Sequence, residues 1–362
     1  MQKKIIALAV AALASSAAFA QTNVTIYGIA DASVSATTAL GSTAHQTQYN
    51  VNSGTLSTSR IGFKGVEDLG NGLKALFVLE YGLNIDQSAG IGASSNPSAV
   101  ARQQMVGLTG GFGTAVAGHL QTTGLDFTLA GSALGSSSPL GATNVVEGVS
   151  GNLMSSAATH LISSQIGGRQ DNAVAYISPS LGGVVLAYNH ARVTESALST
   201  GNSDAHGDLL SASYDVGPVS AGAIYTKVTT PTYSASLVQD NIKEWGLRAG
   251  YDFQVVKLQA TYQQAKQDNL AGKDSKYVIS VSAPIGAKVA VIGEYAGLRV
   301  KSDTVGGVNP ANNVQAATLA ATYSLSKRTT AYAGVVARRV DNAANAATGD
   351  TNTYAVGLRH SF

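Results

Sequence analysis

The clearest pattern in the sequence is a strict alternation of apolar and polar side chains. In one segment Val256, Leu258, Ala260 and Tyr262 alternate with Lys257, Gln259, Thr261 and Gln263. A period of two places each set on its own face of a β-strand. Segments 73–81, 276–283 and 317–323 repeat the pattern. It predicts strands with one apolar and one polar face. A soluble β-sandwich also alternates in this way, so the connections must separate the two fold classes.

The same pattern predicts about sixteen strands along the chain. They lie near 23–36, 55–67, 72–84, 100–109, 112–121, 168–179, 182–194, 206–216, 218–230, 240–252, 254–266, 273–284, 287–301, 313–325, 328–341 and 352–362.

Long and tight connections alternate between these strands. Long ones include 85–99 and 122–167, whereas Gly110-Gly111 and Ser326-Lys327 are tight turns. This arrangement predicts an up-and-down meander, and an even strand number lets the first and last strands pair antiparallel. Closure leaves no strand edge unpaired, and a sheet can span lipid only when it has no unpaired edge. We therefore expect an all-β fold, a transmembrane antiparallel up-and-down β-barrel of about sixteen strands.

Tyrosines support the membrane interpretation. Many of them share the apolar parity of their strand and lie near one of its ends, where amphipathic rings sit at the level of lipid headgroups. These are Tyr81, Tyr176, Tyr188, Tyr262, Tyr277, Tyr295, Tyr323 and Tyr354. The alternative is that tyrosine is simply common in strands.

The first twenty residues have the features of a cleaved secretory signal peptide. Lys3 and Lys4 precede an apolar stretch too short to span a bilayer, and Ala18-Phe19-Ala20 is a small-residue cleavage site. We assign 1–20 to the signal peptide and 21–362 to the barrel domain. Removal of the two lysines from the 23 basic residues leaves 21, equal to the 21 acidic ones, so the mature chain has no net charge. Nucleic acid is therefore not an expected partner.

Composition excludes several other classes of protein. Only 12% of the residues are charged, 40 are glycine and none is cysteine. Disulfide scaffolds and thiolate metal sites are excluded, and no cofactor motif is present.

Several stretches carry a resemblance to a known family. They are Thr25-Ile26-Tyr27-Gly28, the run from Ser59 to Gly72, Val106-Gly107-Leu108 with Gly111-Phe112-Gly113, Asp171-Asn172 through Pro179, and the terminal Tyr354 to Phe362. In this order, behind a signal peptide, they resemble the general porins of Gram-negative outer membranes, of the beta-proteobacterial type. The resemblance spans the whole mature chain.

The resemblance implies a sixteen-stranded barrel in the cell outer membrane, usually a homotrimer among outer-membrane lipids. It would conduct ions and small hydrophilic solutes by diffusion, with the third long loop, 122–167, folded into the lumen. In such porins the barrel-assembly machinery recognises the last strand. Here the candidate assembly signal is its outward set, Tyr354, Val356, Leu358 and Phe362. A closing strand without a recognition role is the alternative.

Basic residues of inward parity are the candidate lining of the constriction. They are Arg60, Lys64, Lys74, Arg102, His119 and Arg169. Arg60 and Arg102 match positions that resemble the constriction arginines of the family, and His119 stands where the family often has arginine. Because the mature chain is neutral, ion selectivity must arise from such local charges.

Two acidic residues lie on the 122–167 connection, Asp126 and Glu147. They either form a wall opposite the basic residues or tether the loop by accepting N–H groups. Glu80 and Asp171 are further acidic residues that could partly neutralise the basic residues of the constriction. We expect weak to moderate anion selectivity.

Two other functions remain open from the residues alone. The long loops of a barrel can make it an adhesin or receptor. A hydrolase is the other alternative, although the six histidines are scattered without a nucleophile or acid at a recognisable spacing.

Overall fold

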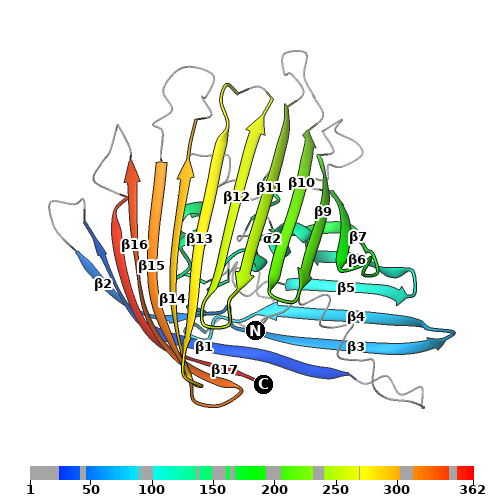
Figure 1. Ribbon diagram of the computed structural model, residues 1–362. Helices are drawn as coiled ribbons and strands as arrows, with labels where there is room; N and C mark the ends of the chain where they lie inside the picture. Colours follow the sequence, from blue (N-terminus) through cyan, green and yellow to red (C-terminus); the bar gives the residue numbers. More distant parts are fainter. Residues whose placement is uncertain are drawn as a thin grey trace.

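The computed structural model describes residues 24–40, 46–88, 91, 101–135, 138–148, 160–163, 168–192, 205–230, 240–268, 270–301, 313–341 and 349–362. The proposed signal peptide at 1–20 lies outside these ranges, as do parts of the 122–167 connection. Strands dominate the described chain, as the period-two pattern predicts (Figure 1).

The strand bounds follow the alternating segments closely. In the first half of the chain they are Thr25–Ala39 (β1), Thr47–Ser53 (β2), Arg60–Gly70 (β3), Leu73–Gly82 (β4), Ala101–Gly110 (β5), Gly113–Gln121 (β6), Arg169–Ile177 (β7), Val184–Arg192 (β8) and His206–Val216 (β9). In the second half they are Val219–Thr230 (β10), Asp240–Asp252 (β11), Lys257–Gln267 (β12), Asp274–Ile285 (β13), Val289–Arg299 (β14), Asn313–Ser324 (β15), Thr329–Asp341 (β16) and Thr351–Ser361 (β17).

Each strand pairs antiparallel with its neighbours, and the last pairs with the first. β1 pairs with β17 over Ile29–Ala39, with Ile29 opposite Ser361. The backbone of Phe362 extends this contact, because its N–H donates to the Gly28 carbonyl at 3.1 Å and its carbonyl accepts the Gly28 N–H at 3.1 Å. The sheet is therefore closed, which confirms the predicted barrel.

One barrel strand is divided in two. β2 pairs with the second half of β1 and β3 with its first five residues, so the two segments share one position in the wall. The 17 segments thus fill 16 positions, in agreement with the predicted strand number. The sequence prediction had assigned 37–54 to a connection, and this part was wrong. β2 does alternate, with Tyr49 and Val51 exposed on the outer face and Gln48, Asn50 and Asn52 on the other parity, but the pattern covers only seven residues and is too short to stand out from a loop.

The segment 54–59 between β2 and β3 is held by Asp31, whose side chain is fully buried. One carboxylate oxygen accepts the N–H groups of Leu56 and Ser57 at 3.0 and 2.6 Å. The other accepts the Tyr332 hydroxyl at 2.5 Å. These contacts satisfy the backbone where the sheet ladder is interrupted.

The two faces of the sheet differ in polarity. Leu258 and Ile279 are 42% and 54% exposed on the outside, whereas Gln259 and Gln263 are 7% and 1% exposed on the inside. Six of the eight predicted outward tyrosines are among the exposed large side chains, and Tyr81 and Tyr277 are half-buried. A closed sheet with an apolar outer band and a polar interior is the arrangement of a barrel that spans lipid.

The connection after β6 contains two short helices, Thr123–Ala130 (α2) and Ala142–Glu147 (α3). α2 contacts β8, β9 and β10, and α3 contacts β14, β15 and β16. Figure 1 shows α2 behind the strands of the front wall. Among the described residues no helix is long and apolar enough to cross a membrane.

A lysine at the centre of the outer band tests the assignment of the two faces. Ile279→Lys should lower the free energy of unfolding by roughly 2–4 kcal/mol, since its ammonium would face hydrocarbon. Ser282→Lys, on the inner parity of the same strand, should change it little. Ser280 is unsuitable as a control because its hydroxyl donates to Glu294 at 2.8 Å. Equal urea midpoints for the two variants refolded into vesicles would contradict the assignment.

Candidate functional site

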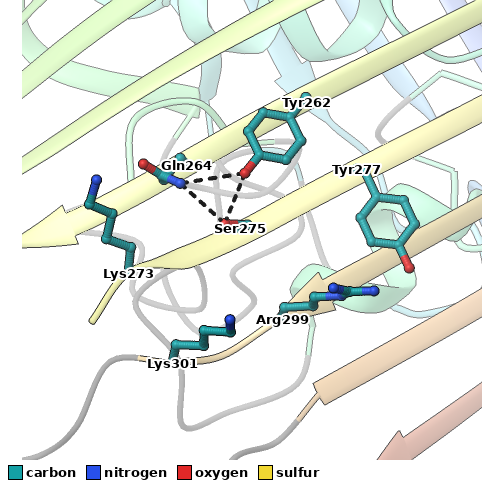
Figure 2. A pocket seen from close by; sticks show the side chains of 7 residues that line it. All are labelled: Tyr262, Gln264, Lys273, Ser275, Tyr277, Arg299 and Lys301. Carbon is teal, nitrogen blue, oxygen red and sulfur yellow. Dashed lines mark hydrogen bonds between the residues drawn. The ribbon is translucent and has the colours of Figure 1, made fainter. Parts of the chain in front are cut away.

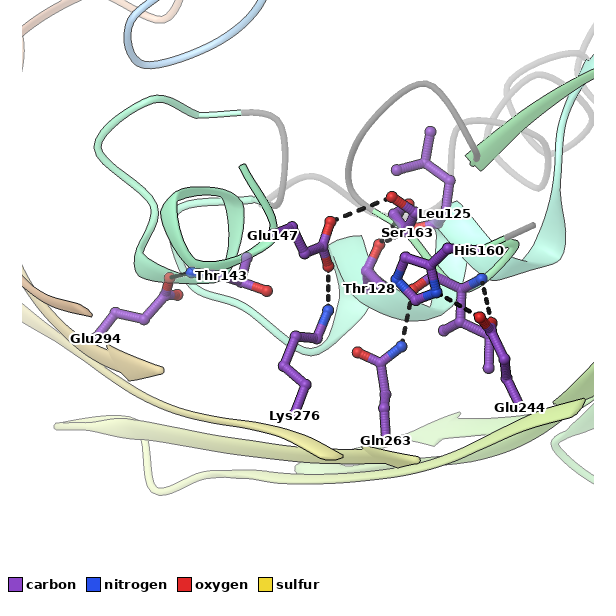
Figure 3. A network of polar contacts seen from close by, with 11 residues as sticks. Leu125, Thr128, Thr143, Glu147, His160, Ser163, Glu244, Gln263, Lys276 and Glu294 are labelled. Carbon is purple, nitrogen blue, oxygen red and sulfur yellow. Dashed lines mark hydrogen bonds and ion pairs between the residues drawn. The ribbon is translucent and has the colours of Figure 1, made fainter. Parts of the chain in front are cut away.

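A buried ion pair and several hydrogen bonds join the described part of the 122–167 segment to the inner wall. Glu147, at the end of α3, forms an ion pair with Lys276 of β13, and both side chains are almost completely buried. The Ser163 hydroxyl donates to the same carboxylate at 3.2 Å. Figure 3 shows Glu147 between Lys276 and Ser163. Glu147 was considered either as part of an acidic wall or as a tether of the loop. These contacts are those of a tether.

A second attachment lies around Glu244 of β11. His160 Nδ1 lies 2.6 Å from Oε1 of Glu244, and the Ile162 N–H donates to Oε2 at 3.1 Å. Gln263 of β12 donates to the Ile162 carbonyl at 2.8 Å. Both ionisable side chains are 2% exposed. Figure 3 places this group next to the first one.

A third attachment is formed by Glu294 of β14. It accepts the Ser132 hydroxyl and the Thr143 N–H, the latter at 3.1 Å. Thr318 of β15 donates to the Leu140 carbonyl at 2.6 Å. Ser132, Leu140 and Thr143 all belong to the same connection, so acceptors and donors of the wall satisfy its backbone and hydroxyl groups.

Apolar packing reinforces these contacts. Leu140, Ala142 and Val146 are buried against inward-facing residues of β14, β15 and β16. A β-carbon at Gly334 would lie 3.2 Å from Leu140 Cδ1, so this glycine lets Leu140 approach the wall. Burial of a leucine or valine side chain such as Leu140 or Val146 contributes about 1.5–3 kcal/mol.

A separate basic cluster surrounds Glu80 of β4. Arg102 Nε of β5 donates to Glu80 Oε1 at 2.8 Å. Arg60 Nε of β3 lies 3.7 Å from Oε2, and the Tyr27 hydroxyl of β1 donates to Oε2 at 3.1 Å. All four side chains come from neighbouring strands and face inward. Glu80 therefore neutralises one of the two guanidinium charges.

Arg169 extends the cluster toward α2. It lies within electrostatic range of Arg102, Arg60, Glu80 and Asp126. Its Nε is buried without a hydrogen-bond partner in the part of the chain that the structure describes. Three arginines against Glu80 leave a formal charge of +2, which Asp126 offsets by one. The Asp126 carboxylate accepts a hydrogen bond from Gln121 at 2.7 Å.

The two predicted lysines have the inner parity, but only Lys64 lies beside this cluster. Lys64 Nζ is 5.3 Å from the centre of the Tyr27 ring, which itself contacts Glu80. Lys74 is half-buried at the opposite end of β4 from Glu80. It is therefore an inner-wall cation away from the cluster.

His119 is not part of the cluster, contrary to the sequence prediction. Its neighbours Val116 and Leu120 face inward at 5% and 1% exposure, so His119 has the outward parity. Its Nδ1 lies 2.6 Å from Oδ1 of Asp171, whose side chain is 78% exposed. The prediction failed because this part of the inner wall is apolar. Val116 and Leu120 pack there with Leu76 and Met105, which reverses the usual rule that apolar residues of a barrel face outward.

The sequence analysis missed one residue of the cluster and one beside it. Tyr27 was recognised only as part of a family-like stretch. Arg359 of β17 donates from Nη1 to the Ser57 hydroxyl at 3.2 Å and contributes to the electrostatic environment of Arg60. Its inward parity was visible in the sequence, but only the closure of β17 on β1 brings it to this wall.

The outward set of the last strand has the expected placement. Tyr354, Val356, Leu358 and Phe362 are 46–59% exposed. They therefore face outward on the strand that closes the barrel against β1.

The described residues contain no group of three or more His, Cys, Asp or Glu side chains that could hold a metal ion. The inner wall does offer a concentration of guanidinium groups on β3, β5 and β7, and a segment attached at three places to β11, β13, β14 and β15.

Comparison with known proteins identifies the family. Residues 7–343 match the family described as Gram-negative porin. The chain belongs to this family. Its outer-membrane location and its function as a diffusion channel follow, and membership favours the channel over the adhesin and hydrolase alternatives.

Individual relatives agree with this assignment. The porin is 30% identical over 383 residues to outer membrane porin protein 32 of Delftia acidovorans, and the match covers the full length of both chains. Major outer membrane protein P.IB of Neisseria gonorrhoeae is 39% identical over 124 residues, 34% of this chain and 33% of the other. Among solved structures, an anion-selective porin from Comamonas acidovorans superimposes with a TM-score of 0.74 at 26% identity, covering 94% of this porin and all of the other.

The pair of Glu147 and Lys276 gives a test of the anchored segment. Glu147→Gln should lower the free energy of unfolding by about 3–5 kcal/mol, because it leaves a buried ammonium group without its partner. Adding Lys276→Met should restore most of the loss. The exposed pair of Lys243 and Asp268 is the control, where Lys243→Gln should cost less than about 1 kcal/mol. Equal costs for Glu147→Gln and Lys243→Gln in urea unfolding would refute the tethering role.

Proposed function

We propose that this porin is a weakly to moderately anion-selective channel for small hydrophilic solutes, and that Arg60, Arg102 and Arg169 set its selectivity. The observation that carries the proposal is the inward-facing cluster in which Arg60 and Arg102 share Glu80 and Arg169 lies within electrostatic range of the same carboxylate. Their charge does not depend on pH in the working range, and planar guanidinium groups bind anions through paired N–H donors. The anion-selective relative from Comamonas acidovorans supports the same sign of selectivity.

The 122–167 segment narrows the passage in this proposal. Three polar attachments and the packing of Leu140 and Val146 hold it against inward-facing wall residues. Asp126 of α2 lies within electrostatic range of Arg169, so this part of the segment lies close to the basic cluster. Charges influence passing ions only within a Debye length, about 10 Å at 0.1 M salt, and a narrow passage satisfies this condition.

Three further proposals concern assembly and partners. The signal peptide at 1–20 directs the chain out of the cytoplasm, and residues 21–362 form the barrel domain. The outward set of β17, with Tyr354, Val356, Leu358 and Phe362, is the signal for the barrel-assembly machinery. The porin forms a homotrimer among outer-membrane lipids, for which the small outward residues Gly28, Ala30 and Ala32 of β1 allow close packing.

Neutralising the arginines tests the selectivity proposal. Arg60→Gln combined with Arg102→Gln should lower the chloride-to-potassium permeability ratio and move it toward cation preference, because Glu80 then keeps an uncompensated charge. The control is Lys327→Gln with Arg328→Gln, which removes two charges from the exposed turn after β15. The reversal potential in a salt gradient measures both. The shift should shrink at 1 M salt, where screening acts within about 3 Å. An unchanged reversal potential in the arginine variant would exclude the cluster as the selectivity filter.

The opposite change at Glu80 gives an independent prediction. Glu80→Gln removes the carboxylate that offsets Arg60 and Arg102, so anion preference should increase. Asp171→Asn is the matched control, because its exposed side chain pairs with outward-facing His119. The same reversal potential measurement at low salt decides the matter. A larger effect from Asp171→Asn than from Glu80→Gln would place the controlling charges elsewhere.

A further inference from the structure

An outward hollow of about 490 Å³ lies on the membrane-facing side of the barrel, at one end of β12, β13 and β14. It is lined by Tyr262, Gln264, Lys273, Ser275, Tyr277, Arg299 and Lys301. Figure 2 shows the three basic side chains around a space beside the two tyrosines. None of these residues takes part in the basic cluster of the inner wall.

The strand register arranges the hollow in levels. Gln264, Ser275 and Arg299 lie opposite one another across the three strands. One level toward the centre of the wall, Tyr262 lies opposite Tyr277. The next outward-facing residue of β13 toward the centre of the wall is Ile279, which is 54% exposed. Polar groups, aromatic rings and apolar side chains thus follow in the order of water, headgroups and hydrocarbon.

Two lysines occupy the outermost level. Lys273 and Lys301 lie two residues beyond Ser275 and Arg299, the last pair of the β13–β14 register, and so just past the paired ends of these strands. Both are exposed, and Figure 2 shows them on adjoining segments. Like charges gathered at one rim repel each other. An anion between them would reduce this repulsion.

No carboxylate of the described residues neutralises these cations. Asp268 is the acidic side chain at this rim, but it lies 3.0 Å from Lys243 Nζ. Hydrogen bonds from Asn241 and Lys243 lower the pKa of Asp268 and keep it charged in that pair. Asp274 is fully buried and accepts the Lys301 N–H at 3.0 Å. Lys273, Arg299 and Lys301 therefore have no ion-pair partner in the described chain.

A glycine shapes the floor of the hollow. A β-carbon at Gly297 would lie 2.4 Å from the Tyr277 ring, so the ring lies directly over this glycine. The guanidinium of Arg299 is 6.0 Å from the centre of the same ring. Cation–π contact holds the guanidinium at the level of the ring while its N–H groups stay available.

We propose that this hollow binds the phosphate of an anionic lipid headgroup in the outer leaflet. The basic groups sit at the barrel end that carries the longer connections, which is the outer side in this architecture. Arg299 supplies a planar set of donors, and Lys273 and Lys301 supply point charges that reach the headgroup level. Basic pockets directly above the hydrocarbon boundary are sites for phosphate-bearing lipids. The acyl chains would lie along Ile279 and Val281 of β13.

The single tryptophan of the chain is a reporter for this site. Trp245 lies opposite Gln264 in the same level, one strand away, and is 38% exposed on the outer face. Its ring centre is 5.4 Å from that of Tyr262. A brominated lipid that occupies the hollow would therefore quench its fluorescence.

The experiment compares two brominated lipids around the refolded porin. Phosphatidic acid carries an accessible phosphate, and phosphatidylcholine is the neutral competitor. Wild-type protein should show a relative binding constant for phosphatidic acid at least about fivefold above that for phosphatidylcholine, the ratio expected from one basic residue at an anionic surface. The variant with Lys273→Gln, Arg299→Gln and Lys301→Gln should bring the ratio close to one. Its urea midpoint confirms folding.

A matched variant and a soluble anion complete the test. Lys288→Gln, Lys327→Gln and Arg328→Gln remove the same charge at the opposite end of the barrel and should leave the quenching ratio at the wild-type value. Millimolar inorganic phosphate, at ionic strength held constant with chloride, should not abolish the preference. Equal ratios for wild type and the Lys273, Arg299 and Lys301 variant would overturn the proposal. Loss of the preference in free phosphate would identify a soluble phosphate as the ligand and overturn the lipid assignment.

Discussion

The structure depends on one constraint: a sheet in lipid must satisfy every backbone N–H and C=O group by closing on itself. The pairing of β1 with β17 meets it, and the terminal residue Phe362 exchanges two backbone hydrogen bonds with Gly28. Closure also separates an outer face from an inner one. The outer face is free to be apolar, while the inner face can carry charges that pair with each other or with the 122–167 segment. The ion pairs and the basic cluster of the inner wall are consequences of this separation.

The inner wall uses its charges in two ways. On β11, β13 and β14 the carboxylate or ammonium groups of Glu244, Lys276 and Glu294 are buried by the 122–167 segment and fully engaged with it. On β3, β5 and β7 the arginines outnumber their shared carboxylate, Glu80, and keep a positive balance. The first group attaches the segment to the wall, and in the proposed function the second provides the field that a passing ion meets. The attachments and the proposed selectivity cluster therefore lie on different parts of the wall.

Much of this was predictable from the sequence, because alternation is a local property. The strands, the closed barrel and the inward parity of Arg60 and Arg102 follow from it. Three features were not predictable, each for a physical reason. β2 alternates over only seven residues, so its pattern was too short to separate it from a loop. Val116 and Leu120 face an apolar part of the interior, so His119 was assigned to the wrong side. The role of Glu147 depends on Lys276, which lies 129 residues away in the sequence.

The measurement that tests the central claim most directly is the reversal potential of the unmodified porin in a potassium chloride gradient, at low salt and at 1 M. Without the proposed signal peptide the chain has no net charge, so in this account any preference comes from local charges at the passage. An excess of arginine over Glu80 predicts a potential of the sign expected for chloride permeation, which decreases as the Debye length falls from about 10 Å to about 3 Å. A potential of cation-selective sign at low salt would contradict the account.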